Sequence, residues 1–135
     1  MKRTLTLTAL AVVAFHSVIV VLHSIAHQVL PVPATQAQLA FIVPVIIVAP
    51  IIAGFMLLKL ETAGMLLLAA SMLGSFVFGV YYHFTADTID HVAHVAHMQP
   101  ALWSQMFQAT SYLLAISEAL GAAIGIVWLA RRSAA

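Results

Sequence analysis

Residues 5–30 read LTLTALAVVAFHSVIVVLHSIAHQVL, a stretch without a single Asp, Glu, Lys or Arg. A helix needs about 20 mostly apolar residues to cross a bilayer, so this stretch is long enough to span one. Three similar apolar runs follow, at about residues 38–58, 64–84 and 104–130. We therefore expect an all-α integral membrane protein that forms a single domain, a transmembrane bundle of four helices.

The composition excludes most other classes of protein. Hydrophobic residues make up 64% of the chain and charged residues 7%, against about 45–50% and about 25% in soluble domains. The absence of cysteine excludes disulfides, thiolate metal sites and iron–sulfur clusters. A net charge of +1 with no basic patch argues against nucleic acid as a partner. The expected partner is the lipid bilayer.

The orientation of the bundle is predicted from its five basic residues, which are Lys2, Arg3, Lys59, Arg131 and Arg132. With four spans, they all fall on the side that carries the N-terminus, the second connection and the C-terminus. The positive-inside rule makes this side cytoplasmic. We expect a multi-pass protein of a bacterial-type inner membrane, with the first connection and the polar third connection, residues 85–103, outside the cytoplasm.

Residues 1–26 could alternatively be a cleaved signal peptide, because two basic residues precede an apolar run. That apolar run is long for a signal peptide and contains His16 and His23. No clean A-x-A cleavage pattern follows it. The first run is therefore interpreted as a helix of the bundle.

Proline and glycine predict two features of the helices. Pro44 and Pro50 each remove a backbone donor from the second span, so we expect that helix to be kinked. Gly121 and Gly125 give the fourth span a face of small residues. Such a face permits close helix packing, either within the bundle or in a homo-oligomer or larger membrane complex.

Three histidines form a stripe on the first span. His16, His23 and His27 lie within about 40° of one another on a helix. The i, i+4 spacing of His23 and His27 lets two imidazoles reach one metal ion. Ionisable residues inside a membrane usually mark a functional site. His23 and His27 are therefore candidate metal ligands.

Further candidate metal ligands lie at the outer ends of the spans. His83 ends the third span, and the third connection adds three loop histidines, which are His91, His94 and His97. If residues 87–97 form a short surface helix, Asp87 faces His91 and Asp90 faces His94, and these acids could orient the imidazoles. The alternative is a solvated amphipathic loop without a metal.

Glu118 is the most costly residue for a membrane span, since a central carboxylate opposes insertion by about 2.5 kcal/mol or more. His16 has the same estimated depth, so we expect the two to pair as a catalytic or proton-relay couple. Ser104 and Ser111 share the face of Glu118. The polar stripes of the first and fourth spans are expected to face each other.

The function that uses the most histidines is a metal-binding membrane protein with a non-haem site near the outer leaflet. The metal would be iron, copper or zinc, which the residues do not distinguish. If the protein is an enzyme, it would be an oxidoreductase acting on a lipid-soluble substrate.

Three alternatives stay open. One is a subunit that transfers electrons through haem b, with His83 and one histidine of the first span as axial ligands. Another is a component of metal or proton transport. The third is a non-catalytic accessory subunit of a larger membrane complex.

Overall fold

The computed structural model describes residues 2–133. Within that range all regular secondary structure is helical. Its elements in chain order are α1 (Lys2–Val29), α2 (Gln36–Phe41), η1 (Ile42–Val48), α3 (Ala49–Leu57), α4 (Glu61–Val80), η2 (Tyr81–Thr85), α5 (Val92–Val95) and α6 (Ala101–Ser133). Four stretches of helix are long and apolar enough to cross a membrane, namely residues 3–29, 36–57, 61–85 and 101–132. The predicted all-α bundle of four candidate spans is confirmed.

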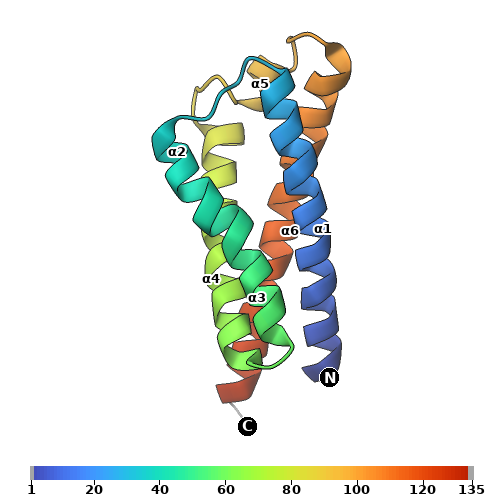
Figure 1. Cartoon of the computed structure of the whole chain (residues 1–135), viewed down its shortest axis with the longest axis vertical. Coiled ribbons are helices and arrows are strands. Elements are labelled where there is room, and N and C mark those ends of the chain that lie inside the picture. Colours follow the sequence, from blue (N-terminus) through green and yellow to red (C-terminus); the bar gives the residue numbers. More distant parts are fainter. Residues whose placement is uncertain (1, 134–135) are drawn as a thin grey trace.

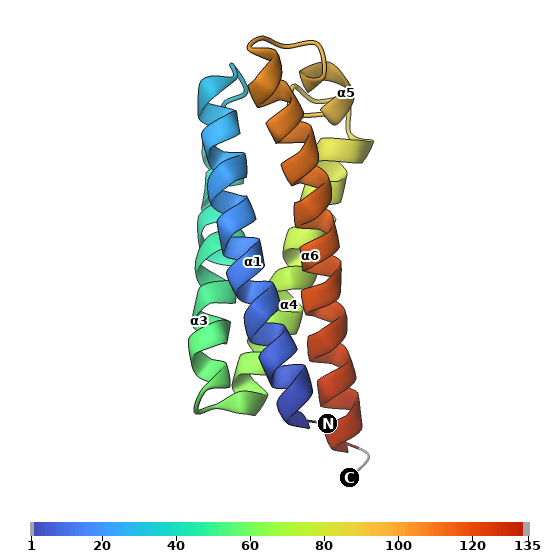
Figure 2. The same cartoon turned by 90° about the vertical axis from the view of Figure 1, so that its right-hand side faces the viewer.

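The spans run side by side along one long axis (Figures 1 and 2). Both chain ends lie at one end of the bundle, which we call the terminal end. The two longer connections, residues 30–35 and 86–100, lie at the other end with α5, which we call the α5 end. This arrangement agrees with an even number of spans, whereas the side of the membrane that each end faces stays a prediction.

The second span is a composite helix made of α2, the π-helical segment η1 and α3. Thr35 begins α2 with a capping box, in which its hydroxyl accepts from the Gln38 amide and its own amide donates to the Gln38 side chain. Pro44 lies inside η1 and Pro50 lies near the start of α3. The helix is therefore π-helical around Pro44 and regular at Pro50, while the predicted kink stays a prediction. Towards the α5 end, α2 diverges from α1 (Figure 1).

The terminal half of the bundle is filled by an apolar core. Its buried members include Ala9, Met65, Leu68 and Met72. The small face of α6 packs here, because a Cβ added at Gly125 would lie 2.9 Å from Ala69 Cβ. The small residues of α6 thus pack against α4 within one chain, which is one of the two predicted options.

The predicted surface helix over residues 87–97 is wrong in extent, because only Val92–Val95 is helical. His91 precedes this short helix as its N-cap, and its ring nitrogen Nδ1 accepts from the amide of Ala93. Asp87 pairs with His94 at 3.3 Å rather than with His91. The side chain of Asp90 is buried, whereas the prediction paired it with His94.

A substitution at Gly125 tests the close packing of α4 and α6. Gly125→Ala places a methyl group 2.9 Å from Ala69 Cβ and 3.0 Å from the Met65 carbonyl oxygen, so backbone must shift. We expect a loss of about 1–3 kcal/mol, measured as a lower unfolding temperature in detergent. Gly74→Ala is the control, because its Cβ meets only side chains, at 3.4 Å or more. Equal unfolding temperatures for the two variants would contradict the packing.

Candidate metal centre

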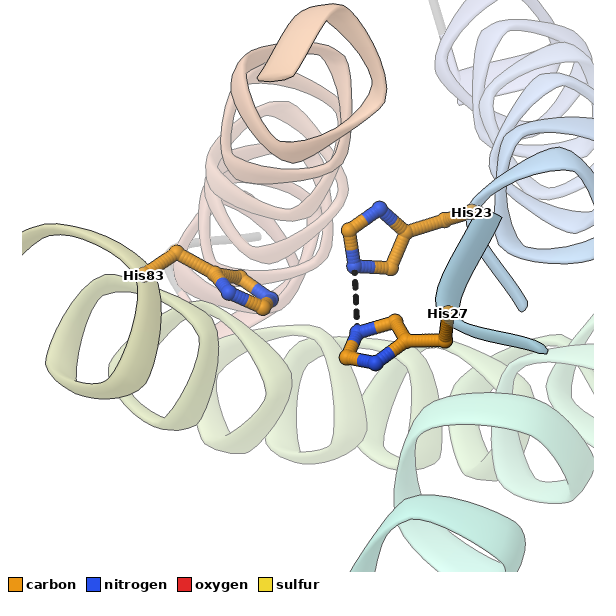
Figure 3. A group of neighbouring side chains, drawn as sticks. All are labelled: His23, His27 and His83. Carbon is orange, nitrogen blue, oxygen red and sulfur yellow. Dashed lines mark hydrogen bonds between the residues drawn. The ribbon is translucent and has the colours of Figure 1, made fainter. Parts of the chain in front are cut away.

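Three of the seven histidines converge at the α5 end of the bundle. His23 and His27 come from successive turns of α1, and His83 comes from η2. Figure 3 shows the ring of His83 directed towards the other two rings. One nitrogen from each ring lies within 4.8 Å of the other two. Within residues 2–133, this is the one group of three or more His or acidic side chains close enough to hold a metal ion.

Backbone carbonyls determine the tautomers of two of these rings. His27 Nδ1 lies 2.8 Å from the carbonyl oxygen of Val32, and His83 Nδ1 lies 3.0 Å from that of Asp90. A carbonyl oxygen can only accept a hydrogen bond. Both Nδ1 atoms therefore carry a proton, which leaves the Nε2 lone pair of each neutral ring available.

A hydroxyl determines the tautomer of the third ring. His23 Nδ1 lies 2.8 Å from Thr110 Oγ1. The Thr110 hydroxyl also lies 2.7 and 3.0 Å from the carbonyl oxygens of Met106 and Phe107, which can only accept. When its single proton goes to one of these carbonyls, Thr110 Oγ1 accepts from His23 Nδ1–H, and all three neutral imidazoles carry the proton on Nδ1. When that proton goes to His23 Nδ1, His23 carries its own proton on Nε2 and donates to His27 Nε2.

With all three protons on Nδ1, the Nε2 lone pairs of His23 and His27 face each other. His23 Nε2 and His27 Nε2 are 3.2 Å apart, a distance at which one of them would have to carry a proton to form a hydrogen bond. Without that proton the two lone pairs repel, and a cation between them removes the repulsion. Zn–N bonds of about 2.0–2.1 Å in tetrahedral geometry place two ligand nitrogens about 3.3 Å apart. The measured separation matches one edge of such a site.

An aromatic ring covers one side of the three histidines. Phe107, which is fully buried, has its ring centroid 4.6 Å from that of His23, 4.8 Å from that of His27 and 5.4 Å from that of His83. On another side, all three imidazoles line a cavity of about 640 Å³ between α1, the second span, η2 and α6. An ion held by the three nitrogens would therefore be shielded by Phe107 and reachable from the cavity.

The cavity has a mostly apolar lining with two acids. Leu39 and Val43 of the second span lie in its wall and are 45% and 47% exposed, so the wall continues to the outer surface of the bundle. Asp90 and Glu118 supply the acidic groups. The cavity thus joins a polar site to a surface that, in a bilayer, faces lipid.

Glu118 is 2% exposed, and among residues 2–133 its Oε2 atom has no hydrogen-bond partner. This oxygen would lie 3.5 Å from a Cβ added at Gly79, one helical turn before His83. Side chains of a helix lean towards its N-terminus, which for α6 is the α5 end. The carboxyl group therefore leans towards the three histidines from deeper in the bundle.

His16 does not form the expected pair with Glu118. Its Nε2–H donates to the Ile46 carbonyl at 3.0 Å, and its Nδ1 lies 3.3 Å from Ser117 Oγ. The Ile46 carbonyl lies four residues before Pro50, which has no N–H to donate to it. His16 thus supplies a donor that proline removes, while a catalytic role for His16 stays a prediction.

The predicted facing of the two polar stripes is found in part. His16 meets Ser117 and His23 meets Thr110, so hydrogen bonds join α1 to α6 at two levels, but each of these partners lies one residue before the predicted Ser111 and Glu118. Ser104 and Ser111 are buried. Each of these serines donates to a backbone carbonyl, Ser104 to Val95 and Ser111 to Phe107.

The three loop histidines lie apart from the centre. His94 is bound to Asp87 through Nε2 and to the Thr88 carbonyl through Nδ1. His91 caps α5, and His97 is exposed. The structure therefore brings His23, His27 and His83 together and leaves the loop histidines as separate surface groups, whose metal role stays a prediction.

Sequence reasoning missed the groups that orient the three imidazoles. Hydroxyl residues such as Thr110 are common in membrane helices, so its role could not be predicted. Every residue has a backbone carbonyl, so the sequence does not indicate that the carbonyl of Val32 binds a histidine. Phe107 is one aromatic residue among many. Only Thr110 carried a hint, since it lies beside Ser111 on the polar stripe of α6.

Comparisons with protein families, curated proteins and solved structures found no match to this chain. The class of protein is therefore defined by what the residues form: a bundle of four candidate membrane spans with a buried group of three histidines that could hold a metal ion.

Replacing His16 separates its structural contacts from the metal centre. His16→Ala leaves the Ile46 carbonyl without this donor and removes one of the two partners of Ser117 Oγ, so we expect a loss of about 1–3 kcal/mol. Metal content should be unchanged, because His16 lies two turns below His23 on α1. Thermal unfolding and metal analysis of the same sample give both values. Loss of metal with unchanged stability would place His16 in the metal centre instead.

Proposed function

We propose that this chain is a metal-dependent membrane protein in which His23, His27 and His83 hold one transition-metal ion through their Nε2 atoms. The supporting observation is that each Nδ1 atom has a partner of its own, a backbone carbonyl for His27 and His83 and the Thr110 hydroxyl for His23, while one nitrogen of each ring shares a common space. Acceptors of this kind are characteristic of metal-binding histidines, since they hold the tautomer and the ring orientation. Three imidazoles suit zinc, iron or copper.

The cavity supports a catalytic use of this ion on a lipid-soluble substrate. Catalytic metal sites keep a position open beside three protein ligands, and here the cavity adjoins the three imidazoles. A bound ion would supply Lewis-acid or redox chemistry at that position. The apolar walls and the exposed Leu39 and Val43 favour a substrate that enters from the bilayer, such as a quinone or an acyl chain, and an oxidoreductase is the proposed class.

Glu118 is proposed as the proton-exchanging group of the same cavity. An isolated charge in an apolar site is costly, so a buried carboxyl group without a partner is favoured in its neutral form. Its unpartnered Oε2 is free to bind a ligand in the cavity. A carboxylic acid held beside a metal-bound substrate can exchange a proton with it.

The geometry favours a single ion over haem. A haem with two axial histidines needs a flat macrocycle between two rings. The nitrogen of the third imidazole lies within 4.8 Å of both of the others and would occupy that space. A macrocycle beside His83 would also need space near Gly79, one turn before it, and the Glu118 carboxyl group lies there.

The packing also favours a binding site over a transport path. Below the level of His16, the terminal half is filled by the core that contains Ala9, Leu68 and Trp128. An ion path would need polar groups across this half. The cavity instead ends at the level of Glu118, the deepest acid in its lining.

Metal analysis of three variants tests the proposed centre. Protein purified in detergent without a histidine tag should contain about one metal ion per chain and show no Soret band. His27→Ala or His83→Ala should lose most of this metal, because each removes one of three ligands. His97→Ala is the matched control, since His97 is an exposed histidine of the loop, and should keep it.

Two results would contradict the metal centre. One is full metal content in His27→Ala that still folds, as judged by circular dichroism and gel filtration. The other is a Soret band that disappears in His83→Ala, which would favour haem.

Replacing Glu118 distinguishes a functional acid from a structural one. Among the described residues Oε2 has no partner, so Glu118→Leu removes an unsatisfied buried group. We expect the free energy of unfolding to stay equal or to rise by about 1–3 kcal/mol. Ser117→Ala, which removes a hydrogen-bonded neighbour, should lower stability. A Glu118→Leu variant that unfolds at a clearly lower temperature would show that the carboxyl group holds the bundle together.

A further inference from the structure

The three histidines do not balance the charge of a bound metal ion. Neutral imidazoles contribute no charge, so a divalent ion would bring two positive charges into an apolar cavity. Buried charge is costly unless it is paired. The side chains of this protein that can supply the opposing charge are carboxylates, and the chain has four, which are Glu61, Asp87, Asp90 and Glu118.

Two of these four acids are accounted for elsewhere. Glu61 begins α4 at the terminal end and accepts a hydrogen bond from Thr6. Asp87 has a side chain that is 93% exposed and is paired with His94. Asp90 and Glu118 are the two acids that line the cavity.

Asp90 is tied to the metal centre from the α5 end. Its backbone carbonyl accepts from His83 Nδ1, and the residue lines the same cavity as His27 and His83. The residue is 6% exposed. In the described part of the chain, its carboxylate is not paired with Lys or Arg, because the basic residues lie at the terminal end.

We propose that Asp90 is the anionic ligand of the metal centre and completes it as a site of three histidines and one carboxylate. This inference rests on the proposed metal function. The carboxylate lies outside the group formed by the three nitrogens, so binding to the ion requires its side chain to move from the position that it has in the structure. Glu118 then remains on the cavity side for the substrate.

This ligand set narrows the choice of metal. Imidazole with carboxylate suits Zn²⁺ and Fe²⁺, whereas Cu⁺ prefers soft sulfur ligands. The carboxylate also lowers the net charge of the loaded site from +2 to +1. The centre should therefore select a divalent ion over Cu⁺.

Binding of Co²⁺, a spectroscopic substitute for Zn²⁺ and Fe²⁺, tests the role of Asp90 in the full-length protein in detergent. Asp90→Asn should weaken Co²⁺ binding about 10- to 100-fold, as the loss of a group bound to a metal site typically does. Asp87→Asn is the matched control, three residues away in the same loop, and should bind within about two-fold of the original protein. Equal affinities of the two variants would overturn the proposal.

A second variant, Asp90→Cys, tests the proposal even if Asp90→Asn does not fold. The chain has no cysteine, so Asp90→Cys introduces a single thiol. If residue 90 reaches the ion, Co²⁺ added to this variant should give a near-ultraviolet thiolate-to-cobalt charge-transfer band, and Asp87→Cys should not. A Co²⁺-loaded Asp90→Cys protein without that band would contradict the proposal.

The outcomes also separate this inference from the proposed function. If the original protein binds no Co²⁺, Zn²⁺ or Fe²⁺, the metal centre itself is wrong. If it binds Co²⁺ and Asp90→Asn binds equally well, the three histidines hold the ion and only the role of Asp90 is wrong.

Discussion

One nitrogen each of His23, His27 and His83 shares a single space between α1, η2 and α6, and the proposed function depends on this convergence. The backbone carbonyls of Val32 and Asp90 hold the Nδ1 protons of His27 and His83, so the Nε2 lone pairs of these two neutral rings are available. The 3.2 Å contact between His23 Nε2 and His27 Nε2 is favourable with a proton on His23 Nε2 or with a metal ion between the rings. A metal ion satisfies all three rings at once, which a single proton does not.

The bundle builds this site by departing from regular helix at two places. The π-helical segment η2 carries His83, and segments of this kind occur frequently at functional sites. The π-helical segment η1 follows α2, which diverges from α1 beside the cavity (Figure 1). His16 stabilises the irregular second span by donating to Ile46. Regular packing is kept in the terminal half, where glycines bring α6 against α4.

The four apolar runs and the spacing of His23 and His27 were enough to predict the bundle and two members of the centre, because helical periodicity is local. His83 was found as a candidate from its place at the end of a span. The pairing of His16 with Glu118 was wrong, since equal depth does not determine which neighbour a side chain meets. Asp90 was expected in a surface helix, and its burial depends on a loop that has no periodic pattern.

The most direct test of the central claim is X-ray absorption spectroscopy at the absorption edge of the metal bound to the purified, tag-free protein. The account predicts three imidazoles bound to one ion, with metal–nitrogen distances of about 2.0–2.1 Å for zinc, and the additional scattering that imidazole rings give. A spectrum with one imidazole or none would contradict the assignment of His23, His27 and His83 as ligands. So would the four equatorial nitrogens of a haem.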